Sequence, residues 1–370
     1  MLDLGLIRNN REAVEAALRK RMDSVDLSGL LERDARRRSV IGEADALKAR
    51  RNQVSSEIPR LKKAGEPVDE LLAEMKDVST RIKEMDQELR DLDEAIRDEL
   101  ARLPNLPADD VVAGGKEANE VLRQGGERPA FEFEPRDHVE LVTSLGLVDY
   151  ERGVKMGGNG FWLYSGVGAR LEWALINYFI DTHLRDGYEF VMPPHLLTYQ
   201  CGFTAGQFPK FEDDVFQLKG EPLEEGEVDA AKRQPGFTHF ILPTAETALI
   251  NFHRDEILAE ADLPRKYFAY TPCYRKEAGS YRAQERGMIR GHQFNKVEIF
   301  QFTAPEHSDE AHNELTAKAE ELVKGLELHY QVTKLAAHDA SATMAKTYDI
   351  EVWIPSMGEY KEVSSISNAH

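Results

Sequence analysis

An apolar heptad pattern runs through residues 38–103 and is interrupted once, by the turn-forming segment 65–67. Before the interruption, apolar positions recur every seven residues at Val40, Leu47, Val54 and Leu61, with Ala44 and Ile58 between them. After it, spacings of four and three alternate through Leu71, Met75, Val78, Ile82, Met85, Leu89, Leu92 and Ile96. Because such a seam is buried only against a second helix, the pattern predicts an antiparallel coiled-coil hairpin within a domain spanning residues 1–102.

The two halves of this hairpin differ in charge. Residues 28–63 hold ten basic and five acidic side chains, whereas residues 66–100 hold five basic and thirteen acidic ones. The basic half offers a surface for nucleic-acid phosphates, although the whole chain has a net charge of −19. The same charges would also suit a coiled coil that is only solvated and paired across its helices, and the hairpin alone leaves both interpretations open.

The residues that follow indicate an α+β domain. Prolines and glycines are frequent in residues 103–130, which are expected to form a linker to a domain spanning residues 131–370. Helices are predicted at 167–185, 244–260 and 308–330. Strands are predicted at 188–192, 266–274, 287–302, 331–337, 347–355 and 360–367. Few βαβ units occur among them, so we expect an antiparallel sheet with helices packed on one side.

Composition narrows the setting of the protein. No run of about 18 apolar residues occurs, which argues against a membrane-spanning helix. The N-terminus lacks a basic segment followed by an apolar one, so we expect no secretory signal. Cys201 and Cys273 are the only cysteines and lie far apart in the chain. Two such thiols are typical of a cytoplasmic protein without a disulfide framework.

Residues 274–302 form the segment that is richest in chemically active side chains. They read YRKEAGSYRAQERG and then MIRGHQFNKVEIFQF, which predicts a strand, a polar loop and a second strand. Alternation along the second strand puts a mostly charged set on one face: Arg290, His292, Phe294, Lys296 and Glu298. This polar face can line a cleft, or it can be a solvent-exposed surface whose charges pair with one another.

The same segment resembles motif 2 of class II aminoacyl-tRNA synthetases, in the form found in seryl-tRNA synthetases. The resemblance lies in Arg-x-Glu at 275–277 and in Arg-x-His-Gln-Phe-x-Lys-Val-Glu at 290–298. Four further segments resemble the same family in the same order: motif 1 at 168–194, the loop after it at 206–211, the serine-binding loop at 244–246, and the stretch entering motif 3 at 348–365. The resemblance covers nearly the whole chain and implies a coiled-coil arm joined to a class II catalytic domain, an antiparallel β-sheet flanked by helices.

The resemblance also implies an activity. The chain would use ATP and Mg²⁺ to activate L-serine as seryl-adenylate and would transfer serine to tRNA(Ser), and also to tRNA(Sec). It would be a cytoplasmic homodimer whose arm contacts tRNA, with no membrane association. Roles in ATP binding fall on Arg275, Glu277, Arg290, Phe294, Glu362 and Ser365, of which the first three are the catalytic set. Glu362 and Ser365 are also the family's positions for the magnesium carried by ATP.

Serine recognition is implied for Thr244, Glu246, Arg275 and Glu298. Glu246 would bind the serine ammonium group, and Glu298 would bind the hydroxyl. Thr244 also precedes a predicted helix, where threonine is a common N-cap, and that role is compatible with substrate contact. His292 can titrate near neutrality, but we favour a structural role for it because the implied chemistry needs no side-chain base.

The sequence departs from the family pattern in three places. It ends at His370, within motif 3 and before the family's adenine-packing arginine, so we expect an incomplete version of a longer protein. The loop at 281–285 is bulkier than usual, and Gly291 stands where valine is common. Besides a housekeeping enzyme, these departures leave open a specialised paralogue that supplies seryl-tRNA to a biosynthetic pathway. They also leave open a non-catalytic relative that binds RNA or a partner.

Overall fold

The computed structural model describes residues 1–218, 237–277 and 287–370. These residues form two compact units, Met1–Pro104 and Asn105–His370. The loop at 281–285, which the sequence analysis singled out, lies outside the described residues. Within the described ranges, no helix is long and apolar enough to cross a membrane.

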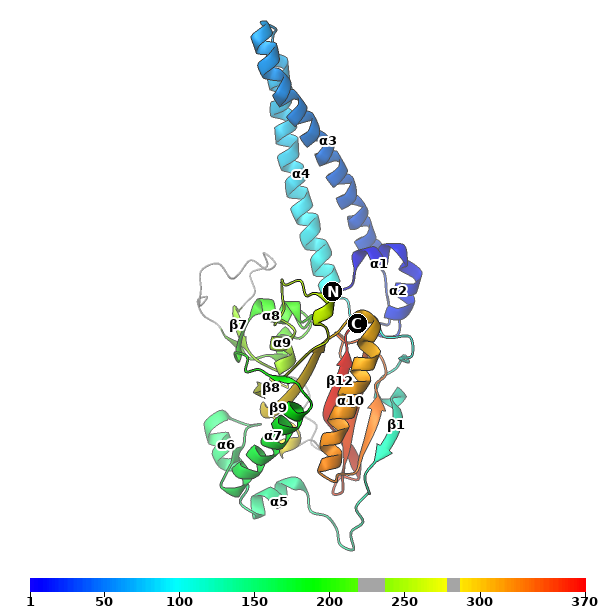
Figure 1. The fold of residues 1–370 in the computed structure, drawn as a ribbon, viewed down its shortest axis with the longest axis vertical. Helices are drawn as coiled ribbons and strands as arrows, with labels where there is room; N and C mark the ends of the chain where they lie inside the picture. The colour runs from blue at the N-terminus through cyan, green and yellow to red at the C-terminus, as the bar shows by residue number, and fades with distance from the viewer. Residues whose placement is uncertain (219–236, 278–286) are drawn as a thin grey trace. The chain divides into compact units, whose positions relative to one another are not determined.

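The first unit contains the predicted helical hairpin, which is thereby confirmed (Figure 1). Its helices are α1 (Leu4–Asn9), α2 (Arg11–Leu18), α3 (Ser28–Ala64) and α4 (Asp69–Arg102). Gly65 ends α3 with a φ of 77°, a left-handed conformation that glycine adopts at no steric cost. Val40, Ala44 and Met85 are buried between α3 and α4, as the heptads predict.

Charged side chains pair across the hairpin along the part of α3 that is far from the turn. Five basic residues of α3 meet acids of α4 at N–O distances of 2.5–3.2 Å: Arg33–Glu99, Arg36–Glu88, Arg37–Asp93, Lys48–Asp86 and Arg50–Glu74. Closer to the turn, the described residues provide no ion pair for a second group: Arg51, Arg60, Lys62 and Lys63. Charge pairing therefore accounts for the first group, and the second group is available to an external anion.

The second unit is built around two sheets with the strand orders β1-β10-β11-β12 and β4-β8-β9. The strands are β1 (Glu120–Gly125), β4 (Glu189–Phe190), β8 (Arg265–Tyr274), β9 (Gln293–Phe302), β10 (Tyr330–Lys334), β11 (Lys346–Ile354) and β12 (Glu359–Asn368). All neighbours are antiparallel except β4 and β8. Short strands form two further small sheets: β2 (Val148–Asp149), β3 (Leu163–Tyr164), β5 (Leu196–Thr198), β6 (Gln217–Leu218) and β7 (His239–Ile241). The predicted α+β class is confirmed.

The helices of this unit agree in part with the prediction. They are α5 (His138–Ser144), α6 (Tyr150–Gly157), α7 (Val167–Arg185), α8 (Tyr199–Thr204), α9 (Ala245–Leu249) and α10 (Ser308–Gly325). The bounds of α7 are those predicted. The helix predicted over 244–260 is wrong beyond Leu249, because Asp255 has a φ of 64° and the fully exposed Ile257 has no apolar surface to pack on. Likewise, β9 starts later than predicted, after a 3₁₀ turn at Gly287–Ile289.

Residues 120–125, which were predicted to belong to a linker, instead form the edge strand β1 beside β10. Arg123 of this strand pairs with the buried carboxylate of Glu320 on α10. Further upstream, the backbone N–H groups of Asn105 and Ala108 donate to the carbonyl oxygens of residues 342 and 345. These contacts are invisible to local periodicity because every partner is more than 190 residues away in the chain.

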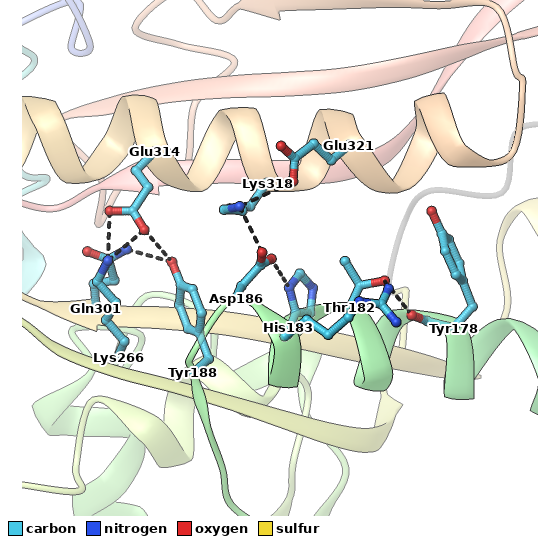
Figure 2. Close-up of polar contacts among 11 residues, drawn as sticks. Tyr178, Thr182, His183, Asp186, Tyr188, Lys266, Gln301, Glu314, Lys318 and Glu321 are labelled. Atoms are coloured by element: carbon cyan, nitrogen blue, oxygen red, sulfur yellow. Dashed lines mark hydrogen bonds and ion pairs between the residues drawn. The ribbon is translucent and has the colours of Figure 1, made fainter.

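Helix α10 joins the two sheets through apolar and polar contacts. Ala319 and Val323 pack on the core of the β10–β12 sheet. On another side of the helix, Figure 2 shows Glu314 of α10 beside Lys266 of β8, at an Nζ–Oε1 distance of 2.6 Å. Lys318 of α10 donates to Asp186, just after α7, at 2.8 Å (Figure 2). The helix therefore contacts both sheets of this unit.

Candidate active site

Strands β8 and β9 provide one wall of the site. Their register pairs Cys273 with Phe294, Thr271 with Lys296 and Ala269 with Glu298. Phe294, Lys296 and Glu298 therefore share a face, as alternation predicts. Phe294 packs on the core around Cys273, and the guanidinium of Arg275 lies 5.2 Å from the centre of its ring. Arg290 and His292 belong to the turn before β9.

Two side chains of this face, Lys296 and Glu298, form a cluster with Thr244, which we call the Thr244 cluster. Thr244 is the N-cap of α9, and its Oγ1 accepts a hydrogen bond from the Glu246 N–H at 3.3 Å. The same hydroxyl accepts from Lys296 Nζ at 2.7 Å and donates to Glu298 Oε2 at 2.8 Å. Lys296 also forms a close ion pair with Glu298 Oε2. Strand alternation predicts the place of Lys296 on this face, but the family resemblance implies no role for it.

Glu246 is half-buried next to the cluster. Burial, and then the negative charge of Glu298, raise the pKa of Glu246 to about 7, against the opposing positive charges of Lys296 and Arg275. A carboxyl group whose ionised form is disfavoured mainly by burial gains from a further cationic partner. The site is therefore suited to an ammonium group.

Arg275 is held by the backbone on two sides. Its Nε donates to the carbonyl oxygen of Pro243 at 3.2 Å. Its own carbonyl oxygen accepts a hydrogen bond from His292 Nδ1 at 3.0 Å, since a carbonyl oxygen can only accept. His292 thus supports the backbone of Arg275, in line with the structural role that we favoured. Glu277 and Arg290 form an ion pair with one another at 2.5 Å.

Strand β12 contributes the last two predicted residues, Glu362 and Ser365. Ser365 lies opposite Asp349 of β11, and its hydroxyl donates to Asp349 Oδ1 at 2.6 Å. Burial, and then the charge of Glu362, raise the pKa of Asp349 to about 8. Desolvation also raises the pKa of Glu362, and the positive charges of Arg275 and Lys296 oppose that rise. The fold therefore brings Glu362 within the electrostatic reach of the β8–β9 face.

Asp349 is a residue that sequence reasoning missed, although it stands in the segment that resembles the approach to motif 3. Only the register of β11 and β12 reveals that it orients Ser365. Among the described residues, no group of three or more His, Cys, Asp or Glu side chains could hold a metal ion by itself. A cation bound near Glu362 and Ser365 would need ligands from a bound anion as well.

The unusual glycine at position 291 has a steric explanation. A Cβ atom there would lie 2.1 Å from Trp162 Cζ3 and 2.9 Å from the carbonyl oxygen of Gly160. Gly291→Val is therefore expected to lower the free energy of unfolding by about 1–3 kcal/mol, measured by denaturant titration. Adding Trp162→Leu should recover part of the loss, because the two changes share one contact. A Gly291→Val protein as stable as the wild type would contradict this packing.

Comparison with known proteins agrees with the geometry of the site. The family described as seryl-tRNA synthetase N-terminal domain matches residues 1–107, and the family described as tRNA synthetase class II core domain (G, H, P, S and T) matches residues 232–370. Serine–tRNA ligase 2 of Clostridium acetobutylicum is 58% identical over 370 residues, covering all of this chain and 84% of that protein.

Solved structures give the same result. Seryl-tRNA synthetase from Pyrococcus horikoshii, complexed with ATP, superposes with a TM-score of 0.90 at 34% identity, over all of this chain and 84% of that one. Cytoplasmic serine–tRNA ligase from Naegleria fowleri, in complex with AMP, has a TM-score of 0.82 at 26% identity, over the same shares. From its match to both family domains and its identity to relatives over its whole length, this chain belongs to the seryl-tRNA synthetase family, the class II enzymes that ligate serine to tRNA.

Proposed function

We propose that this chain activates L-serine with ATP to form seryl-adenylate and then transfers serine to tRNA(Ser), and also to tRNA(Sec). The observation that carries the proposal is the Thr244 cluster, which lies beside the half-buried Glu246 and within reach of Arg275. These groups can bind a hydroxyl, an ammonium and a carboxylate, which are the three polar groups of serine.

In this proposal, ATP binds along the β8–β9 face, as the ATP and AMP complexes of the two relatives support. Phe294 would stack on the adenine, Glu277 would accept from its amino group, and Arg290 would contact the outer phosphates. Because Glu277 and Arg290 pair with one another in the structure, ATP binding would exchange that ion pair for contacts to ATP.

Arg275 would carry the main electrostatic part of the reaction. When the serine carboxylate attacks the α-phosphorus, a P–O bond forms and the bond to pyrophosphate breaks. Negative charge builds on the α-phosphate oxygens at that point. A guanidinium already held by Pro243 and Phe294 stabilises this charge without reorganising, which lowers the barrier.

Glu362 and Ser365 fit a magnesium ion that shares its ligands with ATP. Both offer oxygen donors of the kind Mg²⁺ prefers, and the raised pKa values of Glu362 and of the neighbouring Asp349 mean that a cation placed there would favour their ionised forms. When bound, Mg²⁺ would neutralise phosphate charge. Asp349 would keep the Ser365 hydroxyl proton turned away from the ion, so that an oxygen lone pair faces it.

The α3–α4 hairpin would contact tRNA. The basic residues of α3 without ion pairs among the described residues supply the phosphate-binding charge: Arg51, Arg60, Lys62 and Lys63.

The α7 region would form a homodimer. A set of large apolar side chains on and after α7 is exposed, as at a subunit interface: Val167, Leu171, Trp173, Leu184, Phe190, Met192 and Leu196. We infer a tRNA-binding domain at 1–102, a catalytic domain beginning after residue 130, and a cytoplasmic site of action, where the proposed substrates meet.

The test is serine-dependent exchange between ATP and pyrophosphate by the purified full-length protein. Serine should support exchange about 10⁴–10⁵ times better than alanine, because alanine leaves Oε1 of the half-buried Glu298 without a hydrogen-bond donor. Equal exchange with the two amino acids, or none with serine, would overturn the proposal. Charging of tRNA(Ser) that weakens as salt rises, together with sedimentation as a dimer, would test the proposed partners.

A further inference from the structure

The inference concerns Lys296 and rests on the proposed function. Lys296 is one of the residues of the β9 face, and it lies between Thr244 of the loop before α9 and Glu298 of its own strand. Its side chain is 30% exposed and that of Glu298 is 17% exposed. A lysine in such a position has exchanged most of its hydration for these two contacts.

The Thr244 hydroxyl already makes all the hydrogen bonds that it can donate or accept. A hydroxyl has one proton to donate and two lone pairs with which to accept. The proton goes to Glu298 Oε2, and the lone pairs accept from Lys296 Nζ and from the Glu246 N–H. The hydroxyl thus has no proton left for a substrate, and its orientation is set by Lys296.

The two contacts to Glu298 converge on the same oxygen. Both the Thr244 hydroxyl and Lys296 Nζ contact Oε2, and no described residue forms a hydrogen bond or ion pair with Oε1. A carboxylate fixed through one oxygen presents the other in a single direction as an acceptor. An alcohol O–H fits an acceptor of this kind, whereas a methyl group leaves it unpaired.

We propose that Lys296 is a specificity-determining positioning residue for serine: it fixes Glu298 so that Oε1 accepts the serine hydroxyl, and it orients the Thr244 hydroxyl toward Glu298. Lys296 itself does not touch the substrate. Its role differs from that of a general structural lysine because it acts on one acceptor atom.

The positive charge of Lys296 has a second effect that can be measured independently, on the pH dependence of activity. The charged groups that face Glu246 are Glu298 and Lys296 from β9 and Arg275 from the end of β8. The Lys296 charge lowers the pKa of Glu246, so its removal should raise that pKa above about 7. Glu246 binds the serine ammonium group only when ionised. The fall of kcat/KM for serine on acidification should therefore begin at a higher pH in a Lys296 variant.

The experiment compares Lys296→Met with Lys266→Met in ATP–pyrophosphate exchange from about pH 5.5 to about pH 9. Lys266 is a matched control on the adjacent strand, with a side chain 28% exposed and paired to Glu314 (Figure 2). For Lys296→Met we expect the serine-over-alanine ratio to fall by at least about 10-fold. We also expect the acidic limb of the pH profile of kcat/KM for serine to move to higher pH by at least about half a pH unit. KM for ATP should change less than about 3-fold. Lys266→Met should change none of these.

Two further variants keep the test decisive. Lys296→Arg retains the charge and should keep the acidic limb of the wild type, while losing part of the discrimination because its planar head differs in shape. If Lys296→Met fails to fold, Lys296→Gln gives the same two readouts. The inference would be overturned by a Lys296→Met or Lys296→Gln variant that matches the wild type both in its serine-over-alanine ratio and in the acidic limb of its kcat/KM profile. Absence of serine-dependent exchange in the wild type would instead overturn the proposed function.

Discussion

Replacement of Arg275 by alanine is expected to reduce kcat/KM in serine-dependent pyrophosphate exchange by about 10²–10³-fold. The guanidinium is the one cation that is held both against Phe294 and by the Pro243 carbonyl oxygen in the described part of the site. Its loss removes a preorganised positive charge from the place where negative charge develops. Steady-state exchange rates at saturating ATP and varied serine give the measurement.

A matched control for this change is Arg265→Ala at the other end of the same strand. Arg265 pairs with Asp262 at 3.2 Å, outside the site. Arg265→Ala should leave kcat/KM for pyrophosphate exchange within about 3-fold of the wild-type value, because the lost ion pair is exposed and such pairs contribute little to stability. An Arg275→Ala enzyme that is no slower than the Arg265→Ala enzyme would remove Arg275 from the mechanism.

Replacement of Glu246 by glutamine should have opposite effects on activity and stability. We expect kcat/KM for serine to fall by about 10²–10³-fold, because the ammonium group loses its charged partner. We expect the free energy of unfolding at pH 8 to rise by about 1–3 kcal/mol, because the folded protein no longer holds a half-buried carboxylate beside Glu298. Exchange kinetics and urea titrations measure the two effects.

The pH dependence of this stability gain follows from the direction of the pKa shift. The pKa of Glu246 is raised from 4.5 to about 7 on folding, so ionisation opposes folding. The wild type should lose stability relative to Glu246→Gln as pH rises from about 4.5 to about 7, with a constant difference above that range. A difference that is the same at pH 4 and pH 8 would contradict the shift. The exposed Glu256→Gln serves as the control.

The fold was predictable wherever a local pattern determines it. The hairpin follows from heptads whose seam can be buried only against a second helix, and a glycine in the left-handed region marks its turn. The common face of Phe294, Lys296 and Glu298 follows from the two-residue period of a strand. These features depend on neighbours in the chain, so the sequence itself carries the signal.

What only the tertiary structure decided depends on partners far away in the chain. Edge strand β1 forms from residues that read as a linker, because its ladder needs β10. Asp349 meets Ser365 through the β11–β12 register, and Thr244 meets Lys296 across 52 residues. The raised pKa of Glu246 requires both burial and a second carboxylate, and neither is visible along the chain. The sequence by itself determined which side chains share the β9 face, but only packing determined which oxygen and which charge each one presents.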